Sequence, residues 1–280
     1  MGVVTTETQP SDIKIAVIGA GTIGEALIAG LINAGVSPRS IRATNRRGER
    51  GAELAQRYGI IATTDNNEAV SDADVCFLCV KPNQVVDVIS GINKTVAKND
   101  ASTVLVSMAA GVTLSAMEDA VCAVGTALAR VMPNTPMLVG RGVHVVSYGR
   151  YVTDEQQQRV HGLLAATGRV VVVEEKLIDK ATALSGSGPA YFFLIAEALI
   201  DAGVALGLPG SVATELATAT AAGAGEMLLG EAGPVGLRRA VTSPGGATAA
   251  AIRELEESGV RGALYRATEA CAERARELGA

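Results

Sequence analysis

Three glycines near the start of the chain, Gly19, Gly21 and Gly24, have the spacing of a dinucleotide-binding turn. In such a turn the first glycine permits a tight bend, the second lets a pyrophosphate approach the backbone, and the third lets the following helix pack closely on a sheet. Free N–H groups at the helix start then bind the anion. We therefore predict a dinucleotide site, the alternative being a glycine-rich turn without a ligand. The residues of this site are Gly19, Ala20, Gly21, Thr22, Ile23 and Gly24.

The segment that distinguishes NADP from NAD in such sites comes about 20 residues after the glycines. There this chain has Thr44, Asn45, Arg46 and Arg47, and no carboxylate to hold a ribose hydroxyl. Guanidinium groups form paired, charge-assisted hydrogen bonds with phosphate oxygens. With Asn45, Arg46 and Arg47 as ligands, the segment favours NADP(H) over NAD(H). The alternative is that the two arginines only form a solvated first turn of the next helix.

Cys76 and Cys79 have the spacing of a thiol or metal pair, but they lie in an apolar run over residues 75–80 that is typical of a buried strand. Residues three apart on a strand face opposite sides of the sheet, so these two thiols cannot share a metal. The two histidines, His144 and His161, are too few for a histidine-based zinc site or a Ser-His-Asp relay. We expect neither a metal site nor a catalytic thiol.

Two later segments, Leu184–Tyr191 and Val241–Thr248, place glycines and hydroxyls before an alanine-rich helix. The start of a helix attracts anions because its first N–H groups have no acceptor within the helix. Each segment is a candidate anion site, and helix capping is the alternative for each taken alone. The segments Val80–Asn83 and Ser107–Gly111 follow predicted strands, where ligands bind in open α/β sheets. We expect them beside the nicotinamide.

Up to Gly111 the chain alternates short apolar runs with helix-like stretches. This alternation predicts parallel strands joined by crossover helices, and strands that are apolar throughout indicate a sheet covered on both faces. We predict an α/β fold whose N-terminal Rossmann-type doubly wound sheet spans residues 13–174, after a disordered arm over residues 1–12. The predicted strands are Ile13–Gly19, Ile41–Asn45, Ile60–Thr63, Val75–Val80, Val104–Met108, Val139–Ser147 and Arg169–Val173, and the predicted helices are Glu25–Ala34, Glu49–Tyr58 and Thr153–Ala166.

Residues 175–280 contain no strand-like run and are rich in alanine. Several of their helices are apolar nearly all round, and roughly 105 residues of helix cannot bury every such face within themselves. We predict an all-helical C-terminal dimerisation domain over residues 175–280. Its predicted helices are Pro189–Leu206, Ser211–Leu229, Ala247–Glu257 and Arg261–Leu278.

Composition narrows the classes of partner. With 48% hydrophobic and 19% charged residues the chain is not intrinsically disordered, and its formal net charge of −5 lacks the basic excess that nucleic acid binding requires. The longest candidate for a membrane span, Tyr191–Leu208, carries Glu197 and Asp201, so we expect no membrane partner. Four scattered cysteines indicate a reducing compartment and a cytoplasmic location.

The strongest family signal is the run Leu237–Thr248. Four further motifs accompany it, namely Val80–Pro82, Ala109–Thr113, Arg130–Pro136 and Leu184–Tyr191. On these motifs the chain after residue 12 resembles the pyrroline-5-carboxylate reductase family, which forms proline with NAD(P)H. The GGTT form of the family's last loop is changed here, since Ala247 stands in place of the first threonine, whereas Thr248 is retained.

The resemblance implies NADPH-dependent reduction of 1-pyrroline-5-carboxylate to L-proline, the last step of proline biosynthesis, by hydride transfer to the cyclic imine. It also implies a homodimer through the C-terminal helices, often within a larger ring such as a decamer. The substrate carboxylate docks on the helix start formed by Ser243, Gly245, Gly246 and Ala247, and Thr248 is the catalytic hydroxyl at the ring nitrogen. The remaining implied residues are Glu231 and Glu174 for the substrate, and Asn66, Val80, Lys81, Pro82, Met108, Ala109 and Ala110 for the cofactor.

Two other functions are weighed against this one. A 3-hydroxyacid dehydrogenase shares the architecture but usually has a catalytic lysine on a helix of the second domain, and residues 181–280 contain no lysine. A non-catalytic NADP-binding sensor would use the second half only to dimerise. Such a sensor has no need of Thr248 or of the anion site at residues 243–246.

Overall fold

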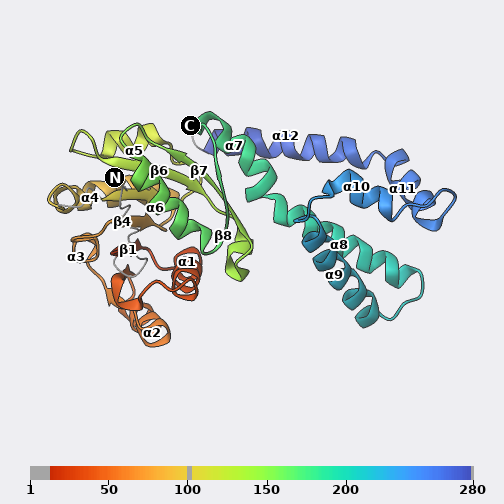
Figure 1. The fold of residues 1–280 in the computed structure, drawn as a ribbon, viewed down its shortest axis with the longest axis horizontal. Coiled ribbons are helices and arrows are strands. Elements are labelled where there is room, and N and C mark those ends of the chain that lie inside the picture. Colours follow the sequence, from red (N-terminus) through yellow and green to blue (C-terminus); the bar gives the residue numbers. More distant parts are fainter. Residues whose placement is uncertain (1–12, 100–102, 279–280) are drawn as a thin grey trace, which may run out of the picture. The chain divides into compact units, whose positions relative to one another are not determined.

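The computed structural model describes residues 13–99 and 103–278. The chain divides into two compact units (Figure 1): Met1–Gly186 with Ala272–Ala280, and Ser187–Cys271. The first unit thus runs past Glu174, where the sequence analysis placed the end of the Rossmann domain. The arm expected over residues 1–12 lies outside the described residues.

The first unit is built on one eight-stranded sheet with the strand order β3-β2-β1-β4-β5-β6-β7-β8. The strands from β3 to β6 are parallel to one another, β7 is antiparallel to β6, and β8 is parallel to β7. The strand order reverses between β1 and β4, the position at which doubly wound sheets bind ligands. The strands are β1 (Ile15–Ile18), β2 (Ile41–Thr44), β3 (Ile61–Thr63), β4 (Val75–Leu78), β5 (Val104–Ser107), β6 (Ala127–Met132), β7 (Gly142–Tyr148) and β8 (Gly168–Val172).

The sheet buries both of its faces, which explains why its central strands are apolar throughout. In β1, Ile15 and Val17 join one apolar cluster, whereas Ala16 and Ile18 join a second one on the other face. Helices α1, α2 and α6 contribute to the first cluster and α3, α4 and α5 to the second. The helices are α1 (Thr22–Asn33), α2 (Gly48–Tyr58), α3 (Asn66–Val70), α4 (Val85–Val96), α5 (Leu114–Ala120), α6 (Asp154–Ala165) and α7 (Ile178–Ala181), with 3-10 turns η2 (Pro38–Ser40), η3 (Pro82–Gln84), η4 (Thr135–Val139) and η5 (Glu175–Leu177).

The predicted doubly wound sheet is confirmed, and so is α6, which starts with a capping box between Thr153 and Gln156. Strand β6 and helices α3, α4, α5, α7 and α10 were not predicted. The strand expected to begin at Val139 begins at Gly142 instead. Val139 ends the turn η4, and Gly140 follows with a φ of 71°, a left-handed conformation that interrupts an extended chain.

The second unit is helical, and its helices have little core of their own. The buried residues of α8 and α9 are Gly188, Ala213 and Ala217, and α10 and α11 have none. A helix that keeps its apolar side chains outside needs a partner surface. The helices are α8 (Gly188–Ala205), α9 (Gly210–Met227), α10 (Gly233–Ala240), α11 (Ala247–Glu257) and α12 (Val260–Leu278), the last of which runs on into the first unit.

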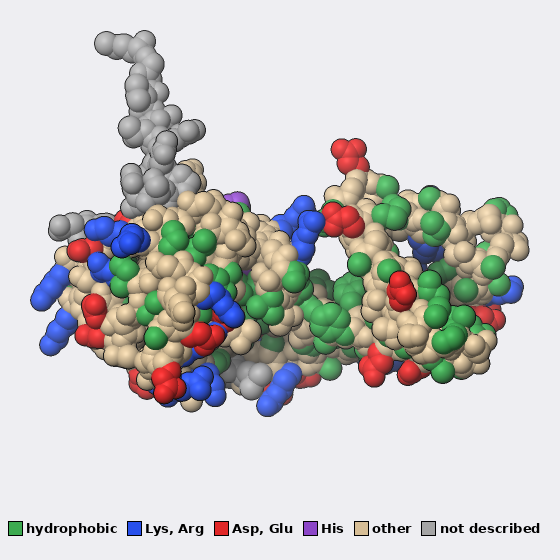
Figure 2. All heavy atoms as spheres, turned by 90° about the horizontal axis from the view of Figure 1, so that it is seen from below, with side chains coloured by type: hydrophobic (Ala, Val, Ile, Leu, Met, Phe, Trp, Pro, Cys, Tyr) green, Lys and Arg blue, Asp and Glu red, His purple; other side chains and the backbone are tan. Residues whose placement is uncertain are grey.

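Large hydrophobic side chains lie at the surface of the second unit, as the green spheres of Figure 2 show. On α8 alone Phe192 and Phe193 are each 66% exposed and Leu194 is 65% exposed. The helical run Glu175–Ala205 is long and apolar enough to cross a membrane by length and composition only, and 6% of its most apolar window is buried. A subunit interface explains such exposure equally well, so this run alone is weak evidence for a membrane span.

Candidate functional site

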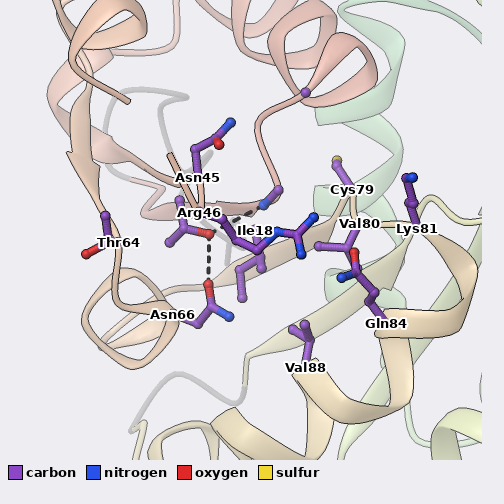
Figure 3. Close-up of a pocket in the computed structure, with 13 residues that line it drawn as sticks. Ile18, Asn45, Arg46, Thr64, Asn66, Cys79, Val80, Lys81, Gln84 and Val88 are labelled. Atoms are coloured by element: carbon purple, nitrogen blue, oxygen red, sulfur yellow. Dashed lines mark hydrogen bonds between the residues drawn. The ribbon is translucent and has the colours of Figure 1, made fainter. Parts of the chain in front are cut away.

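A pocket of about 280 Å³ opens at the carboxyl ends of β1, β2, β3 and β4 (Figure 3). It therefore lies where the strand order reverses, as the fold predicts for a ligand site. The glycine turn and the segment after β2 both contribute to its wall. The lining residues are Ile18, Gly19, Gly21, Thr44, Asn45, Arg46, Thr64, Asn66, Cys79, Val80, Lys81, Gln84 and Val88.

The three glycines of the turn have different surroundings. Gly19 has a φ of 87°, and a Cβ atom there would lie 2.7 Å from Val80 Cγ1. At Gly24 a Cβ atom would lie 2.9 Å from the Gly19 carbonyl oxygen and 3.2 Å from Val17 Cγ1, so this glycine lets α1 pack against β1. At Gly21 a Cβ atom would meet nothing within 4 Å. The space in front of Gly21 is the part of the turn that a ligand can approach.

Helix α1 presents uncapped N–H groups to this pocket. Its N-cap is Gly21, which has no side chain and makes no capping bond. The first hydrogen bond within the helix is donated by the N–H of Glu25 to the carbonyl of Gly21 over 2.8 Å. Helices α3, α5 and α6, by contrast, have side-chain caps from Asp65, Thr113 and Thr153. Uncapped N–H groups and the helix dipole favour an anion, and the open space at Gly21 admits one, so the turn fits a pyrophosphate.

Hydrogen bonds hold the end of β2 beside the turn. The backbone N–H groups of Gly19 and Ala20 donate to the Thr44 carbonyl over 3.2 and 2.9 Å, and Thr44 Oγ1 donates to Asn66 Oδ1 over 2.8 Å. Asn45 Nδ2 donates to the Ala20 carbonyl over 3.2 Å. The glycine turn, β2 and the start of α3 therefore form one rigid wall of the pocket.

The arginines after β2 differ in whether they are already paired. Arg50 and Arg57 both contact the carboxylate of Glu25. Arg46 and Arg47 are exposed and have no ion pair among the described residues. Arg46 extends across the pocket toward Val80 and Gln84 in Figure 3, and Arg47 is the N-cap residue of α2. An unpaired guanidinium in the pocket wall, with a second one on the next residue, suits a 2′-phosphate.

The structure brings together part of the predicted cofactor set. Asn45, Arg46, Asn66, Val80 and Lys81 line the pocket with Gly19 and Gly21. The other predicted residues lie outside the lining: Ala20, Gly24, Met108 and Ala109 are buried, and Thr22, Ile23, Arg47, Pro82 and Ala110 are at least partly exposed.

The lining also includes residues that the sequence analysis did not propose as ligands. Ile18, Thr44, Thr64 and Cys79 lie at strand ends, a position that could have identified them. Gln84 and Val88 belong to η3 and α4, so only a prediction of α4 would have placed Val88 in the pocket.

A second helix start in the other unit repeats the arrangement of α1. Helix α11 has Gly246 as its N-cap without a capping bond, and the first N–H of its ladder is that of Ala250, which donates to Gly246 O over 3.2 Å. Gly245 takes a φ of 71°, and the Gly246 N–H donates to the Ser243 carbonyl over 3.1 Å, which closes the turn. Ser243, Gly245, Ala247 and Thr248 are exposed. The segment therefore has the predicted form of an anion-binding helix start.

Capping does not account for Thr248. The residue stands two positions after the N-cap Gly246, and α11 begins without any side-chain cap.

Glu231 lies in the same unit as Thr248, exposed between α9 and α10, whereas Glu174 lies in the first unit, paired with Lys176 over 2.6 Å. The other predicted anion loop, Leu184–Tyr191, is not a loop. Residues 182–186 form a π-helical turn that continues into α8.

Cys76 and Cys79 lie as the sequence analysis expected. Cys76 packs in one apolar cluster and Cys79 against the other, so the two thiols face opposite sides of the sheet, and burial raises both pKa values, that of Cys79 to about 12. His144 is buried on β7, where burial lowers its pKa to about 4, and its Nε2 lies 2.8 Å from Thr167 Oγ1. Within residues 13–99 and 103–278 no group of His, Cys, Asp and Glu has the form of a metal site. That the reaction needs no metal stays a prediction.

Comparisons with known proteins agree with this geometry. Residues 175–278 match the family model described as pyrroline-5-carboxylate reductase dimerisation, and residues 14–111 match that of NADP oxidoreductase coenzyme F420-dependent. The chain is 57% identical over 267 residues to a pyrroline-5-carboxylate reductase of Corynebacterium melassecola, covering 95% of this chain and 98% of that protein.

Solved structures show the same relation. A pyrroline-5-carboxylate reductase from Coxiella burnetii superposes with a TM-score of 0.92 at 36% identity and covers 96% of this chain and 99% of its own. A pyrroline carboxylate reductase from Plasmodium falciparum with NADP bound superposes with a TM-score of 0.82 at 29% identity over the same shares of the two chains.

Proposed function

This chain belongs to the pyrroline-5-carboxylate reductase family, and from that premise we propose that it reduces 1-pyrroline-5-carboxylate to L-proline with NADPH. The observation that carries the proposal is the pair of helix starts with a glycine N-cap and no capping bond, α1 and α11, in a chain whose similarity to that family spans nearly its whole length. One start suits the pyrophosphate of a dinucleotide, and the other suits the carboxylate of a small substrate.

The reaction makes modest demands on the protein. The cofactor supplies a hydride, and a protonated cyclic imine is already electrophilic. The chain has to bind the substrate carboxylate, orient the ring and hold the reacting atoms about 3 to 3.5 Å apart. We assign the carboxylate to the turn of Ser243, Gly245, Gly246 and Ala247 and the ring nitrogen to the hydroxyl of Thr248. Glu231 and Glu174 complete the proposed substrate residues.

We assign the cofactor to the glycine turn and to the pocket beside it. The pyrophosphate binds at the N–H groups of Thr22, Ile23 and Gly24, and the 2′-phosphate binds to Arg46 and Arg47. Lys81 and the segment after β5 lie on the nicotinamide side. The two assignments share no residue, so each can be altered separately.

An assay of NADPH oxidation by the pure protein tests the proposal. With 1-pyrroline-5-carboxylate we expect rapid turnover, and with carbonyl compounds derived from 3-hydroxyacids we expect none above the background. Turnover of the carbonyls alone would favour the dehydrogenase function. Binding of NADPH without turnover of either class would favour the non-catalytic sensor.

We predict that the double variant Arg46→Ala, Arg47→Ala loses its preference for NADPH. A charge-assisted hydrogen bond contributes about 1.5 to 3 kcal/mol, so the KM for NADPH should rise roughly 10- to 150-fold, toward the lower end because both side chains are exposed. The KM for NADH should change little, since NADH has no 2′-phosphate. Steady-state kinetics with both cofactors measure the split, and equal weakening of the two would contradict the assignment.

The family model for dimerisation indicates that the chain oligomerises through its C-terminal helices. We propose a homodimer, with a larger ring such as a decamer as its further assembly, because the exposed apolar side chains of α8 need cover. Light scattering at micromolar concentration should give at least twice the 28.5 kDa of one chain. Phe193→Glu should lower that mass, whereas Val139→Glu, at an even more exposed position in the first unit, should not. An active monomer of the unaltered protein would contradict the proposal.

We further propose that the protein acts in the cytoplasm, without a nucleic acid or membrane partner. All four cysteines are free thiols, as a reducing compartment allows. The net charge of −5 disfavours nucleic acid, and a dimer interface accounts for the exposed apolar face of α8 without a bilayer. Fractionation of cells that express the protein tests the location.

A further inference from the structure

Glu25 joins the two helices whose first turns form the proposed cofactor site. It belongs to the first turn of α1, and its carboxylate accepts hydrogen bonds from three residues of α2. Arg50 contacts it most closely, Arg57 Nη1 lies 2.8 Å from Oε1, and the Tyr58 hydroxyl donates over 3.1 Å. The side chains of Glu25 and Arg50 are 20% and 21% exposed, so this contact is shielded from much of the solvent.

Helix α2 has few other anchors. Of its eleven residues, Gly51 and Leu54 are buried, with Leu54 in the apolar core and Gly51 against Ala62 of β3. Tyr58, in the last turn, is partly buried and packs against the same core, so the apolar contacts of α2 are few. The contacts to Glu25 come from both the first and the last turn of α2, and they therefore fix its orientation relative to α1.

The start of α2 carries the phosphate-binding arginines. Arg47 is the N-cap residue, and its carbonyl accepts the N–H groups of Arg50 and Gly51 over 3.1 and 3.3 Å. The Arg47 N–H in turn donates to Asn45 Oδ1 over 3.1 Å. A displacement of Arg50 thus moves Arg47, and with it the segment that leads to Arg46.

A carboxylate at the start of α1 would repel a bound pyrophosphate if its charge were not compensated. Burial opposes ionisation of Glu25, but the hydrogen bonds from Tyr58 and Arg57 and the charge and hydrogen bond of Arg50 outweigh it, so its pKa lies below the ordinary value. The group is therefore charged at neutral pH and balanced by two guanidiniums. Because Arg50 and Arg57 are paired with Glu25, Arg46 and Arg47 are the arginines of this segment that keep their guanidinium groups free of an ion pair.

We propose that Glu25 is a positioning residue that sets the spacing between the pyrophosphate site at α1 and the 2′-phosphate site at α2. It touches neither phosphate and acts through Arg50. The inference rests on the proposed function, because it requires that Arg46 and Arg47 bind the 2′-phosphate. It goes beyond that function by placing part of the preference for NADPH in a residue outside the binding surface.

Calorimetric binding of NADP⁺ and of NAD⁺ to the dimeric full chain tests the inference. Both ligands carry the pyrophosphate, and only NADP⁺ carries the 2′-phosphate. Glu25→Ala should raise the Kd for NADP⁺ about 5- to 30-fold, because the displaced arginines lose the best geometry of a charged hydrogen bond to the 2′-phosphate. The Kd for NAD⁺ should rise less than about twofold. Glu25→Gln, which keeps the shape of the side chain, should lie between the wild type and Glu25→Ala.

Glu53→Gln is the matched control. Glu53 also pairs with Arg50, over 2.6 Å, but it belongs to α2 itself, so it does not link the helices. This variant should leave both Kd values unchanged. The melting temperature of each variant reports separately on whether the fold is intact.

Equal weakening of NADP⁺ and NAD⁺ by Glu25→Gln, or no change with either ligand, would overturn the positioning role. The Arg46→Ala, Arg47→Ala protein separates this failure from that of the proposed function. If that protein loses its preference for NADP⁺ while Glu25→Ala keeps it, only the role of Glu25 falls. If it keeps the preference, the arginines do not bind the 2′-phosphate, and both this cofactor assignment and the role of Glu25 fall, whereas the reductase activity is judged by the turnover assay. Adding Glu25→Ala to the double variant should weaken NADP⁺ no further.

Discussion

Gly21→Ala is expected to weaken cofactor binding while the protein stays folded. Gly21 lines the pocket, and a Cβ atom there meets nothing within 4 Å in the protein itself, so we expect the added methyl group to occupy space that the pyrophosphate needs. Gly21 has a φ of −81°, so alanine there avoids the left-handed conformation that Gly19 takes with its φ of 87°. Overpacking against a bound ligand costs about 1 to 3 kcal/mol, so the Kd for NADPH should rise roughly 5- to 150-fold.

Gly24→Ala provides the matched comparison, since it adds the same methyl group three residues later. There the new atom lies 2.9 Å from the Gly19 carbonyl oxygen, so α1 must move away from the turn. We expect a loss of stability of about 1 to 2 kcal/mol, after the gain in helix propensity is subtracted.

Fluorescence titration with NADPH and thermal melting of both variants separate a ligand contact from a packing contact. If Gly21→Ala binds NADPH as tightly as the wild type does, the turn is not the pyrophosphate site. If Gly24→Ala melts at the wild-type temperature, its packing role is wrong.

The glycine turn could be predicted from the sequence because its signal is local. The spacing of Gly19, Gly21 and Gly24, the apolar run before them and the helix after them all fall within one short stretch of chain. The same holds for the start of α11, where Gly245 and Gly246 precede an alanine-rich helix. In both places the absence of a side chain at the N-cap is itself the signal.

Strand β6 was missed because its stability depends on contacts that are distant in the sequence. It contains Arg130, a charged residue that a buried strand disfavours, yet the Arg130 side chain is only 5% exposed. Its guanidinium lies 3.0 Å from Asp179 and 3.3 Å from Glu175, and Glu175 also accepts the Leu114 N–H over 2.6 Å. A buried arginine needs such partners, and no local pattern shows that they come more than forty residues later.

The cofactor residues likewise divide into those with a local signal in the sequence and those without one. Asn45 ends a predicted strand, Arg46 and Lys81 directly follow predicted strands, and all three were found by position. Val88 was not found because α4 was not predicted, although its buried residues Val85, Ile89, Ile92 and Val96 have helical spacing. The role proposed for Glu25 was also invisible, because its partners on α2 are 25 to 33 residues away in the chain.

Thr248→Ala is expected to cut kcat/KM for 1-pyrroline-5-carboxylate about 5- to 150-fold without loss of stability. An orienting hydrogen bond in a site closed to water contributes about 1 to 3 kcal/mol to the transition state. The main alternative role for Thr248, that of a helix cap, does not fit the structure. A capping threonine would stand at the N-cap, where its loss costs about 1 to 2 kcal/mol, but Gly246 holds that position in α11. Alanine is also the better helix former, so the melting temperature should stay the same or rise slightly.

Two companion variants make the test specific. Thr248→Ser keeps a hydroxyl and should recover much of the lost rate, since the hydrogen bond rather than the methyl group orients the imine. Thr214→Ala removes an exposed helical threonine from α9, where its hydroxyl donates to the Gly210 carbonyl over 2.8 Å, and should leave the kinetics unchanged. The affinity for NADPH should be the same in all three proteins, because Thr248 belongs to the substrate site alone. A folded Thr248→Ala protein with the wild-type kcat/KM would exclude the catalytic role of this hydroxyl.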